Sequence, residues 1–225
     1  MNWIAIDFET ANAKYSSACA LGIAIVEHGR IIKRASWLIR PRELYFNYYN
    51  TYIHGITEED VRDKPQFNEL WGEFKPFLDG KIVIAHNASF DIGVLRRLLD
   101  EYGIPYPELH YFCTRVLAKK VWPTLNSYRL NMLSAHLGIS LKHHDAEEDA
   151  VACAEISLRC CGEMGVSRVE DLAMKFGIAK GCLYTDNQKP SNTKHGKVDI
   201  KIPHPPPVPL QRGIKGEEGV VNLSS

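Results

Sequence analysis

Short stretches of apolar residues, bounded by polar or glycine-containing segments, predict several β-strands in this chain. Residues 4–8 are apolar except near their end, which is typical of a central strand buried on both faces. Residues 18–27 and 31–40 are two further strand-like stretches, and His28-Gly29-Arg30 between them predicts the tight turn of a hairpin. Two more strands are predicted at Ile82–Ala85 and Leu109–Cys113.

Apolar residues at helical spacing separate the later strands. A helix is predicted over residues 67–78, where large apolar residues recur three or four positions apart, and Gly80 is a typical helix end. Thr57, followed by three acids, predicts another helix start, because acids are favoured in the first turn. Residues 45–52, with their four tyrosines, are predicted to form a loop. Further helices are predicted at Ser89–Tyr102, at Arg129–Leu137, Asp145–Cys161 and Val169–Phe176, and in a basic segment for which Thr114 is the expected N-cap.

This order of elements predicts the fold class and the domain organisation. Hairpin strands followed by strands that alternate with helices indicate an α/β protein with a mixed sheet flanked by helices. Residues 1–163 are expected to form the main domain, and residues 164–184 a small accessory helical segment. Residues 185–225 are polar and then proline-rich, which predicts a disordered tail that cannot bury a core of its own.

Charge is distributed unevenly over a chain whose net charge is +0. Residues 1–163 hold 18 Lys and Arg against 21 Asp and Glu, which leaves 9 against 6 for residues 164–225. A slightly acidic main domain argues against a protein that wraps a long duplex. It still permits contact with the end of a nucleic acid, provided that cations neutralise its acids and a local basic groove follows the backbone.

Apolar runs and cysteines point to an intracellular protein. No apolar run approaches the roughly 20 residues of a membrane span, and the chain leads directly into a strand without a secretory signal. The six cysteines show neither a CxxC pair nor a regular framework. Free, buried thiols in a reducing compartment are therefore expected, and the cytoplasm is the predicted location.

Acids stand at positions where a buried strand ends. Asp7 and Glu9 close the first strand, Asp91 follows the strand that ends at Ala85, and Asp149 belongs to a later helix start. Solvated surface acids are the plain alternative for each position taken alone. Carboxylates brought together at strand ends repel one another, however, unless a cation neutralises them. Oxygen ligands of this kind suit Mg²⁺ or Mn²⁺, so the pattern favours a metal-dependent phosphodiesterase.

Three sequence blocks, in this order, resemble one nuclease family. They are Asp7-Phe8-Glu9-Thr10, His86-Asn87-Ala88-Ser89-Phe90-Asp91 and the stretch from His144 to Asp149. They resemble the D-x-E-T, H-N-A-x-F-D and H-x-x-x-x-D motifs of the DEDDh 3′→5′ exonucleases, which are relatives of the polymerase III epsilon proofreading subunit. Over residues 1–163 the chain is most similar to the stand-alone exonuclease X-like group. The resemblance implies a ribonuclease H-like fold and an exonuclease domain.

The resemblance also implies roles for the five residues of the motifs. Asp7, Glu9, Asp91 and Asp149 would hold two Mg²⁺ or Mn²⁺ ions, with Asp7 shared between them. His144 would be the general base, because an imidazole can accept a proton from water near neutral pH. The neighbouring His143 is an alternative, and the spacing to Asp149 in the family motif selects His144.

Substrate contacts are expected around the same blocks. Thr10, His54 and Ile56 lie where the family contacts the terminal nucleotide, although an ordinary strand end and loop would explain them too. Asn87 is expected to orient the acids by hydrogen bonds. Arg115, Lys119 and Lys120 would guide the strand or simply form a solvated helix face. The tyrosines of residues 45–52 would stack on bases or pack within the loop.

The expected function is removal of 5′-mononucleotides from the 3′ ends of single-stranded or frayed DNA. RNA 3′-end trimming is the alternative, because the site contacts one terminal nucleotide and reads its sugar only by shape. A further alternative is a proofreading or docking subunit that contacts a DNA polymerase, or another protein, through the C-terminal tail. No membrane partner is expected.

Overall fold

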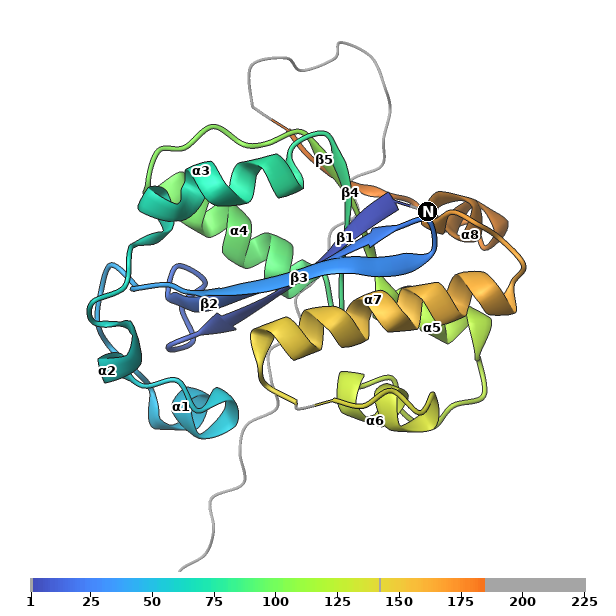
Figure 1. The fold of residues 1–225 in the computed structure, drawn as a ribbon, viewed down its shortest axis with the longest axis horizontal. Helices are drawn as coiled ribbons and strands as arrows, with labels where there is room; N and C mark the ends of the chain where they lie inside the picture. The colour runs from blue at the N-terminus through green and yellow to red at the C-terminus, as the bar shows by residue number, and fades with distance from the viewer. Residues whose placement is uncertain (1, 142, 185–225) are drawn as a thin grey trace, which may run out of the picture. The chain divides into compact units, whose positions relative to one another are not determined.

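A computed structural model describes residues 2–141 and 143–184, and the predicted tail lies outside the described residues. The described part contains a six-stranded mixed sheet with helices on both faces, which confirms the predicted fold class (Figure 1). The strands are β1 (Asn2–Thr10), β2 (Ala18–Glu27), β3 (Arg30–Leu38), β4 (Lys81–Ala85), β5 (Leu109–Cys113) and β6 (Gly181–Leu183). The helices are α1 (Tyr48–His54), α2 (Glu58–Val61), α3 (Phe67–Leu78), α4 (Ser89–Glu101), α5 (Thr114–Val121), α6 (Leu130–His136), α7 (Ala146–Glu163) and α8 (Val169–Lys175).

Strand β1 lies inside the sheet, whose order is β3-β2-β1-β4-β5-β6. It pairs antiparallel with β2 on one side and parallel with β4 on the other. Strands β4 and β5 are also parallel, so β1, β4 and β5 end at the same edge of the sheet. The acids at the end of β1 and the segment that follows β4 are therefore brought together there.

The two faces of the sheet are covered by different helices, as Figure 1 shows. Ile4, Ile6 and Phe8 of β1 share one core with residues of α3 and α4. Trp3 and Ala5 belong to a second core with residues of α5, α6, α7 and α8. Successive side chains of a strand alternate between its faces, so Asp7 and Glu9 continue the row of Trp3 and Ala5 toward α7.

The β2–β3 hairpin confirms its predicted turn. His28 and Gly29 have φ values of 49° and 79°, the left-handed conformation that a tight two-residue turn needs at both central positions. The helices predicted from Thr57 onward and over residues 67–78 are present as α2 and α3. Within α2 the Thr57 and Asp60 side chains form a reciprocal capping box.

The prediction of a loop over residues 45–52 is wrong, because Tyr48–His54 forms helix α1. The two ends of this helix are fixed by the residues that flank it. The Asn47 side chain accepts the Tyr49 N–H at 2.9 Å, and Gly55 ends the helix with φ 76°. No residue of α1 is buried, so the helix has none of the apolar periodicity on which the prediction relied.

Two other details differ from the prediction. Thr114 does not cap α5 but is its first residue, and its buried hydroxyl lies 2.9 Å from His86 Nδ1. Strand β6 was not predicted, since three residues are too few for a recognisable pattern. It pairs antiparallel with β5 at the edge of the sheet. Helix α8 lies where the accessory helix was predicted.

Within residues 2–141 and 143–184, no helix has both the length and the apolar composition that crossing a bilayer requires.

Candidate active site

Three of the four predicted acids come together at the end of β1. The ligand oxygens of Asp7, Glu9 and Asp149 all lie within 4.8 Å of one another. Asp7 and Glu9 reach this point because they lie two residues apart on one face of β1. Asp149 reaches it from the first turn of α7, which packs on the same face. We call these three residues together with Asp91 the acid cluster.

A glycine allows α7 to approach the sheet so closely. Gly22 of β2 lies directly opposite Asp7 in the strand register. A Cβ atom at Gly22 would lie 1.9 Å from the backbone oxygen of Ala146, the first residue of α7. Any side chain at this position would push the start of α7 away, and Asp149 with it.

Asp91 approaches the cluster from the opposite layer. It lies in the first turn of α4 and is 1% exposed. Its Oδ1 accepts the backbone N–H of Phe8 at 3.0 Å, so it is bonded directly to the strand between Asp7 and Glu9. The fourth acid is therefore fixed to the backbone that carries the first two.

Burial raises the pKa values of all four acids, and neighbouring carboxylates raise those of Asp7, Glu9 and Asp91 further. Burial, followed by the charges of Asp91, Glu9 and Asp149, holds the pKa of Asp7 well above its usual value. Burial and the neighbouring carboxylates raise the pKa of Glu9 to about 8. Burial likewise raises the pKa of Asp91 to about 7 and also increases that of Asp149. Such a cluster carries its full charge near neutral pH only when a cation compensates it.

Two histidines lie beside Asp149 and differ in how they contact it. His143 Nδ1 is 3.0 and 3.1 Å from the two carboxylate oxygens of Asp149. The backbone N–H of His144 donates to Asp149 Oδ2 at 3.1 Å. The two rings stack, with centroids 3.7 Å apart. Burial and the neighbouring His143 lower the pKa of His144, which favours the neutral imidazole that can accept a proton.

Two of the three motif blocks contain a residue in the left-handed backbone conformation. Among residues 2–141 and 143–184, three residues other than glycine have positive φ, namely His28, Asn87 and His144. His28 belongs to the hairpin turn, whereas Asn87 and His144 have φ values of 75° and 69° within the second and third blocks. Residues other than glycine adopt this conformation mainly where the surrounding structure requires it, often at functional sites.

The predicted contacts for a terminal nucleotide are hydrogen-bonded to one another. His54 Nε2 donates to the Thr10 carbonyl at 3.2 Å, and its Nδ1 accepts the Ile56 N–H at 3.0 Å. Both ring nitrogens are thus used within the protein, and burial lowers the pKa of His54. His54 and Ile56 line a cavity of about 220 Å³ with His143 and His144.

A second cavity, of about 390 Å³, is also lined by His143 and His144. Its lining includes Asn87, Arg115 and Arg129. Arg115 is therefore next to the site, whereas Lys119 lies over the Tyr128 ring at 5.7 Å. Asn87 is exposed in the turn before α4, where its carbonyl accepts the Phe90 N–H at 2.8 Å.

His86 has a structural place beside this second cavity. Its Nδ1 and Nε2 lie 2.9 Å from Thr114 Oγ1 and from the Tyr128 carbonyl. Burial lowers its pKa to about 4, so the ring is neutral at physiological pH. These bonds join the end of β4 to α5 and to the chain before α6.

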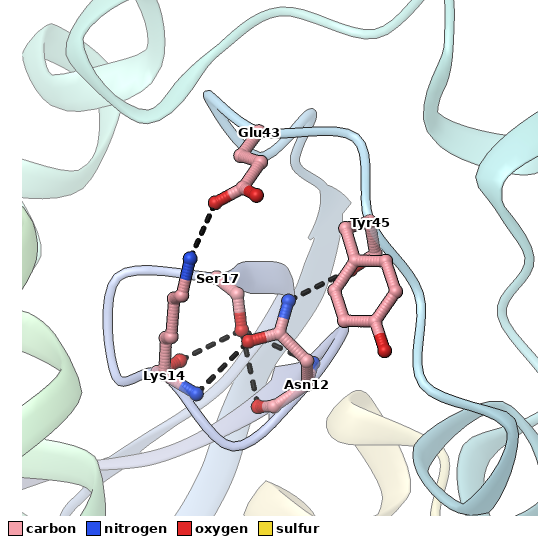
Figure 2. A network of polar contacts seen from close by, with 5 residues as sticks. All are labelled: Asn12, Lys14, Ser17, Glu43 and Tyr45. Carbon is pink, nitrogen blue, oxygen red and sulfur yellow. Dashed lines mark hydrogen bonds and ion pairs between the residues drawn. The ribbon is translucent and has the colours of Figure 1, made fainter.

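The loop after β1 is held by its own side chains (Figure 2). The hydroxyl of Ser17 accepts the Asn12 N–H at 3.1 Å and donates to the Lys14 carbonyl at 2.7 Å. The Asn12 amide donates to the Tyr45 carbonyl at 2.7 Å, and Lys14 pairs with Glu43. This network ties the strand that carries Asp7 and Glu9 to the chain that leads into α1.

Residues 4–157 match the family described as "Exonuclease" (RNase_T). The chain belongs to this family. The match covers more than half of the chain and includes all three motif blocks. It confirms the resemblance to the DnaQ-like, DEDDh 3′→5′ exonucleases, a family of hydrolases.

The exonuclease family includes relatives of different architecture. The DNA polymerase III PolC-type protein of Clostridium perfringens is 31% identical over 159 residues, which are 68% of this chain and 11% of that protein. The chain thus spans about a tenth of the length of this curated relative. The structure of "Exonuclease X in complex with 5′ overhanging duplex DNA" is 26% identical, with a TM-score of 0.63, and covers 76% of this chain and 98% of that one.

A more distant structure shares the fold. The nuclease domain of 3′hExo, described as a DEDDh family member bound to rAMP, is 14% identical with a TM-score of 0.63. The match covers 72% of this chain and 92% of that one. Exonuclease-family neighbours thus share the predicted ribonuclease H-like fold.

Membership of the exonuclease family implies divalent metal ions, and the acid cluster fits them. Its donors are carboxylate oxygens, the ligands that hard divalent cations prefer. Positive charge at this point would also reverse the upward pKa shifts of Asp7, Glu9 and Asp91.

Sequence reasoning missed two residues that lie at the candidate site. The amide of Asn50 donates to the Thr10 carbonyl at 2.8 Å, and Arg129 lines the second cavity. Asn50 lay in the presumed loop, so nothing indicated that it faces β1. Arg129 was assigned to the start of a helix, and only the tertiary fold brings it beside Arg115.

Proposed function

We propose that the chain removes nucleotides from the 3′ ends of single-stranded or frayed DNA and releases 5′-mononucleotides. The observation that carries this proposal is the acid cluster, with two histidines beside Asp149 that also line a cavity. The likeness to Exonuclease X, solved with DNA and matched over 98% of its length, supports DNA as the substrate.

Asp7, Glu9, Asp91 and Asp149 would hold two Mg²⁺ or Mn²⁺ ions. The chemistry that such ions supply is activation of the attacking water and neutralisation of charge on the leaving 3′ oxygen. The protein contributes the position of the ligands. Asp7 and Glu9 are held by the β1–β2 register, and Asp91 is held by its bond to the Phe8 N–H.

His144 would take the proton of the attacking water. Its lowered pKa keeps the ring neutral near pH 7, and its backbone is bonded to Asp149. His143 is the competing candidate, because its own ring contacts both oxygens of Asp149. The motif spacing favours His144, and in this assignment His143 orients Asp149 and packs against the base.

The terminal nucleotide would occupy the cavity lined by His54 and Ile56. His54 would act by fixing the positions of Thr10 and Ile56, since both of its nitrogens are bonded to them. Thr10 and Ile56 would then contact the terminal sugar and base. Asn87 would contact the strand from the second cavity, together with Arg115 and Arg129.

The test is a time course on DNA and RNA oligonucleotides of one sequence, labelled at either end, with Mg²⁺ or Mn²⁺. The 3′ label should leave first, as a mononucleotide, while the 5′-labelled strand shortens stepwise. A 3′-phosphate should slow digestion, and Asp7→Asn is the matched inactive control. Rapid cutting of circular single-stranded DNA would contradict an exonuclease, and faster digestion of RNA would favour 3′-end trimming.

A second candidate function is proofreading beside a DNA polymerase. The observation that favours it is the 31% identity to part of a PolC-type DNA polymerase III. Proofreading predicts that a mismatched 3′ terminus is removed much faster than a paired one, because fraying exposes it. Equal rates on both termini, with fast digestion of free single strands, would favour the stand-alone activity.

A further inference from the structure

Helix α1 presents three tyrosines to solvent. Tyr48, Tyr49 and Tyr52 are 75%, 73% and 78% exposed. The Tyr48 and Tyr52 rings stack at a centroid distance of 6.3 Å, and Tyr49 meets Tyr48 edge-on at 5.8 Å. Single exposed apolar residues are common on proteins, but a cluster of large aromatic rings often marks a binding surface. We call these residues the tyrosine surface.

The helix that carries the tyrosine surface is hydrogen-bonded to the end of β1, the strand of Asp7 and Glu9. Helix α1 has seven residues, none of them buried, and a helix so short is not stable alone. It is anchored by polar bonds to the end of β1. The Asn47 N–H donates to the Ala11 carbonyl at 2.7 Å, and Asn50 and His54 both donate to the Thr10 carbonyl. The face that holds α1 in place is therefore polar, and the aromatic face is left outward.

The same helix leads into the cavity beside the histidines. Ile53 follows Tyr49 by one helical turn, and Ile53 and His54 line that cavity with His144. The tyrosine surface is thus continuous with the cavity proposed for the terminal nucleotide. A strand with its 3′ end in the cavity can pass its preceding nucleotides along α1.

The chemistry of α1 suits nucleic acid bases. Its sequence, Tyr48 to His54, contains neither Asp nor Glu, so no acid of the helix itself repels phosphates. Tyrosine rings stack on any base, because every base has a π-face. They therefore suit an enzyme that processes strands of varied sequence.

We propose that Tyr48, Tyr49 and Tyr52 form a stacking surface for unpaired bases upstream of the 3′-terminal nucleotide. This inference rests on the proposed exonuclease function and adds where the strand runs. The surface sets affinity for the strand, and the acid cluster sets the rate of hydrolysis.

The test separates bases from backbone charge. Fluorescence anisotropy compares a 12-nucleotide oligothymidylate with an abasic oligonucleotide of the same length and charge, using the full chain with Asp7→Asn. Adding Tyr48→Ala and Tyr52→Ala should weaken oligothymidylate binding by about tenfold or more, the loss expected for two stacking contacts. Binding of the abasic strand should not change.

Two matched variants check the cause. The Tyr48→Phe and Tyr52→Phe pair keeps the rings and should bind oligothymidylate like the parent chain. Met174→Ala removes another exposed side chain, 75% exposed on α8, and should have no effect. Equal weakening for both oligonucleotides, no weakening for either, or failure of the Phe pair would each overturn the stacking surface. If the alanine pair binds oligothymidylate as tightly as the parent chain, a protein partner becomes the occupant to examine.

Hydrolysis by the chain without Asp7→Asn distinguishes this inference from the proposed function. The alanine pair should raise KM for the 12-nucleotide strand and leave kcat unchanged. The 4-nitrophenyl ester of thymidine 5′-monophosphate, which has no upstream base, should be cleaved as before. Tyrosine-dependent binding without any hydrolysis would refute the exonuclease and keep the surface. Normal hydrolysis with an unchanged KM would refute only the surface.

Discussion

Two short segments bring an acid to the end of β1 from opposite faces of the sheet. Residues 86–91 join β4 to α4, and residues 143–149 lead into α7. Each contains a left-handed residue, Asn87 or His144, and each places an aspartate in the first turn of a helix. They differ in what the aspartate and the histidine contact.

In residues 86–91 the side chains are bonded to the rest of the fold. Asp91 accepts the Phe8 N–H, and His86 is bonded through both nitrogens to Thr114 and Tyr128. In residues 143–149 the contacts of the aspartate are local, because Asp149 is bonded to His143 and His144 of its own segment. Glu147 and Glu148 of the same segment pair with Arg34 of β3. Both histidines of this segment line cavities.

This difference indicates that the two segments contribute differently to the candidate site. A carboxylate bonded to a neighbouring strand holds its position whatever its charge, which suits a fixed ligand. A carboxylate that is bonded to the half-buried His143 and His144 lies beside imidazoles, the side chains that most often serve as general bases. We expect residues 86–91 to contribute mainly geometry and residues 143–149 to contribute proton transfer.

The largest effect is expected where both segments meet, at Asp7. Asp7→Asn should lower the rate of hydrolysis by more than about a hundredfold, since even outer partners of metal ligands change activity by 10–100-fold. The metal-free variant should melt at the same temperature or higher, because one repelling buried carboxylate is gone. More than a few per cent residual activity with a normal Mg²⁺ titration would remove Asp7 from the site.

The two histidines should differ strongly if residues 143–149 perform proton transfer. His144→Ala should lose about a hundredfold or more of the rate, the usual contribution of a general base, while binding of single strands is kept. His143→Ala should be much milder, because it leaves that base in place. Rates at saturating Mg²⁺ decide the matter. An inactive His143→Ala beside an active His144→Ala would reverse the assignment.

Asp91 and Asp149 should differ in how much their hydrogen bonds contribute to the free energy of unfolding. Asn can still accept a hydrogen bond whereas Ala cannot, so the Asn-to-Ala difference at one position measures the bonds that the aspartate makes. At position 91 this difference should be about 1–3 kcal/mol, because the buried Phe8 N–H loses its acceptor. At position 149 it should be smaller, since the histidine partners are half-buried and can turn to water. Urea unfolding of metal-free Asp91→Asn, Asp91→Ala, Asp149→Asn and Asp149→Ala measures the two differences in free energy of unfolding. Equal differences at the two positions would contradict the distinct roles of the two segments.

The last prediction concerns the pH dependence of the metal-free fold. The folded pKa values of Glu9 and Asp91, about 8 and about 7, lie above the ordinary values of about 4. Their favourable contribution is therefore full below about pH 4 and is lost as the pH rises toward 8. The melting temperature should fall over this range, Mg²⁺ should raise it more at pH 8 than at pH 5, and Glu9→Gln should flatten the profile. A Mg²⁺ effect independent of pH would contradict the shifted carboxylates.

Much of the fold could be predicted because its strands are apolar and its helices end at recognisable residues. Strand Ala18–Glu27 and strand Leu109–Cys113 have the predicted bounds. Helix α1 could not be predicted, because its stability comes from polar bonds to Ala11 and Thr10, which lie about 40 residues earlier. Such bonds leave no periodic pattern in the sequence.

The acids of the site could be named from their motifs, and the strand alternation explains why Asp7 and Glu9 share a face. The contacts could not be named. Nothing in the spacing indicates that His143, rather than His144, places its ring on Asp149, because this depends on the left-handed backbone at His144. The roles of both histidines remain predictions that the paired variants test.

Gly22 has a consequence for how this enzyme can be lost. The distance between Asp149 and the β1 acids depends on a backbone-to-backbone contact between Gly22 and Ala146, with no side chain that could adjust. A single methyl group at position 22 would separate the sheet from α7, and a shift of about 1 Å can lower the rate a hundredfold. A variant with another residue at this position would keep its strands and helices but lose hydrolysis. Measurements of expression and folding would therefore not detect the loss of activity.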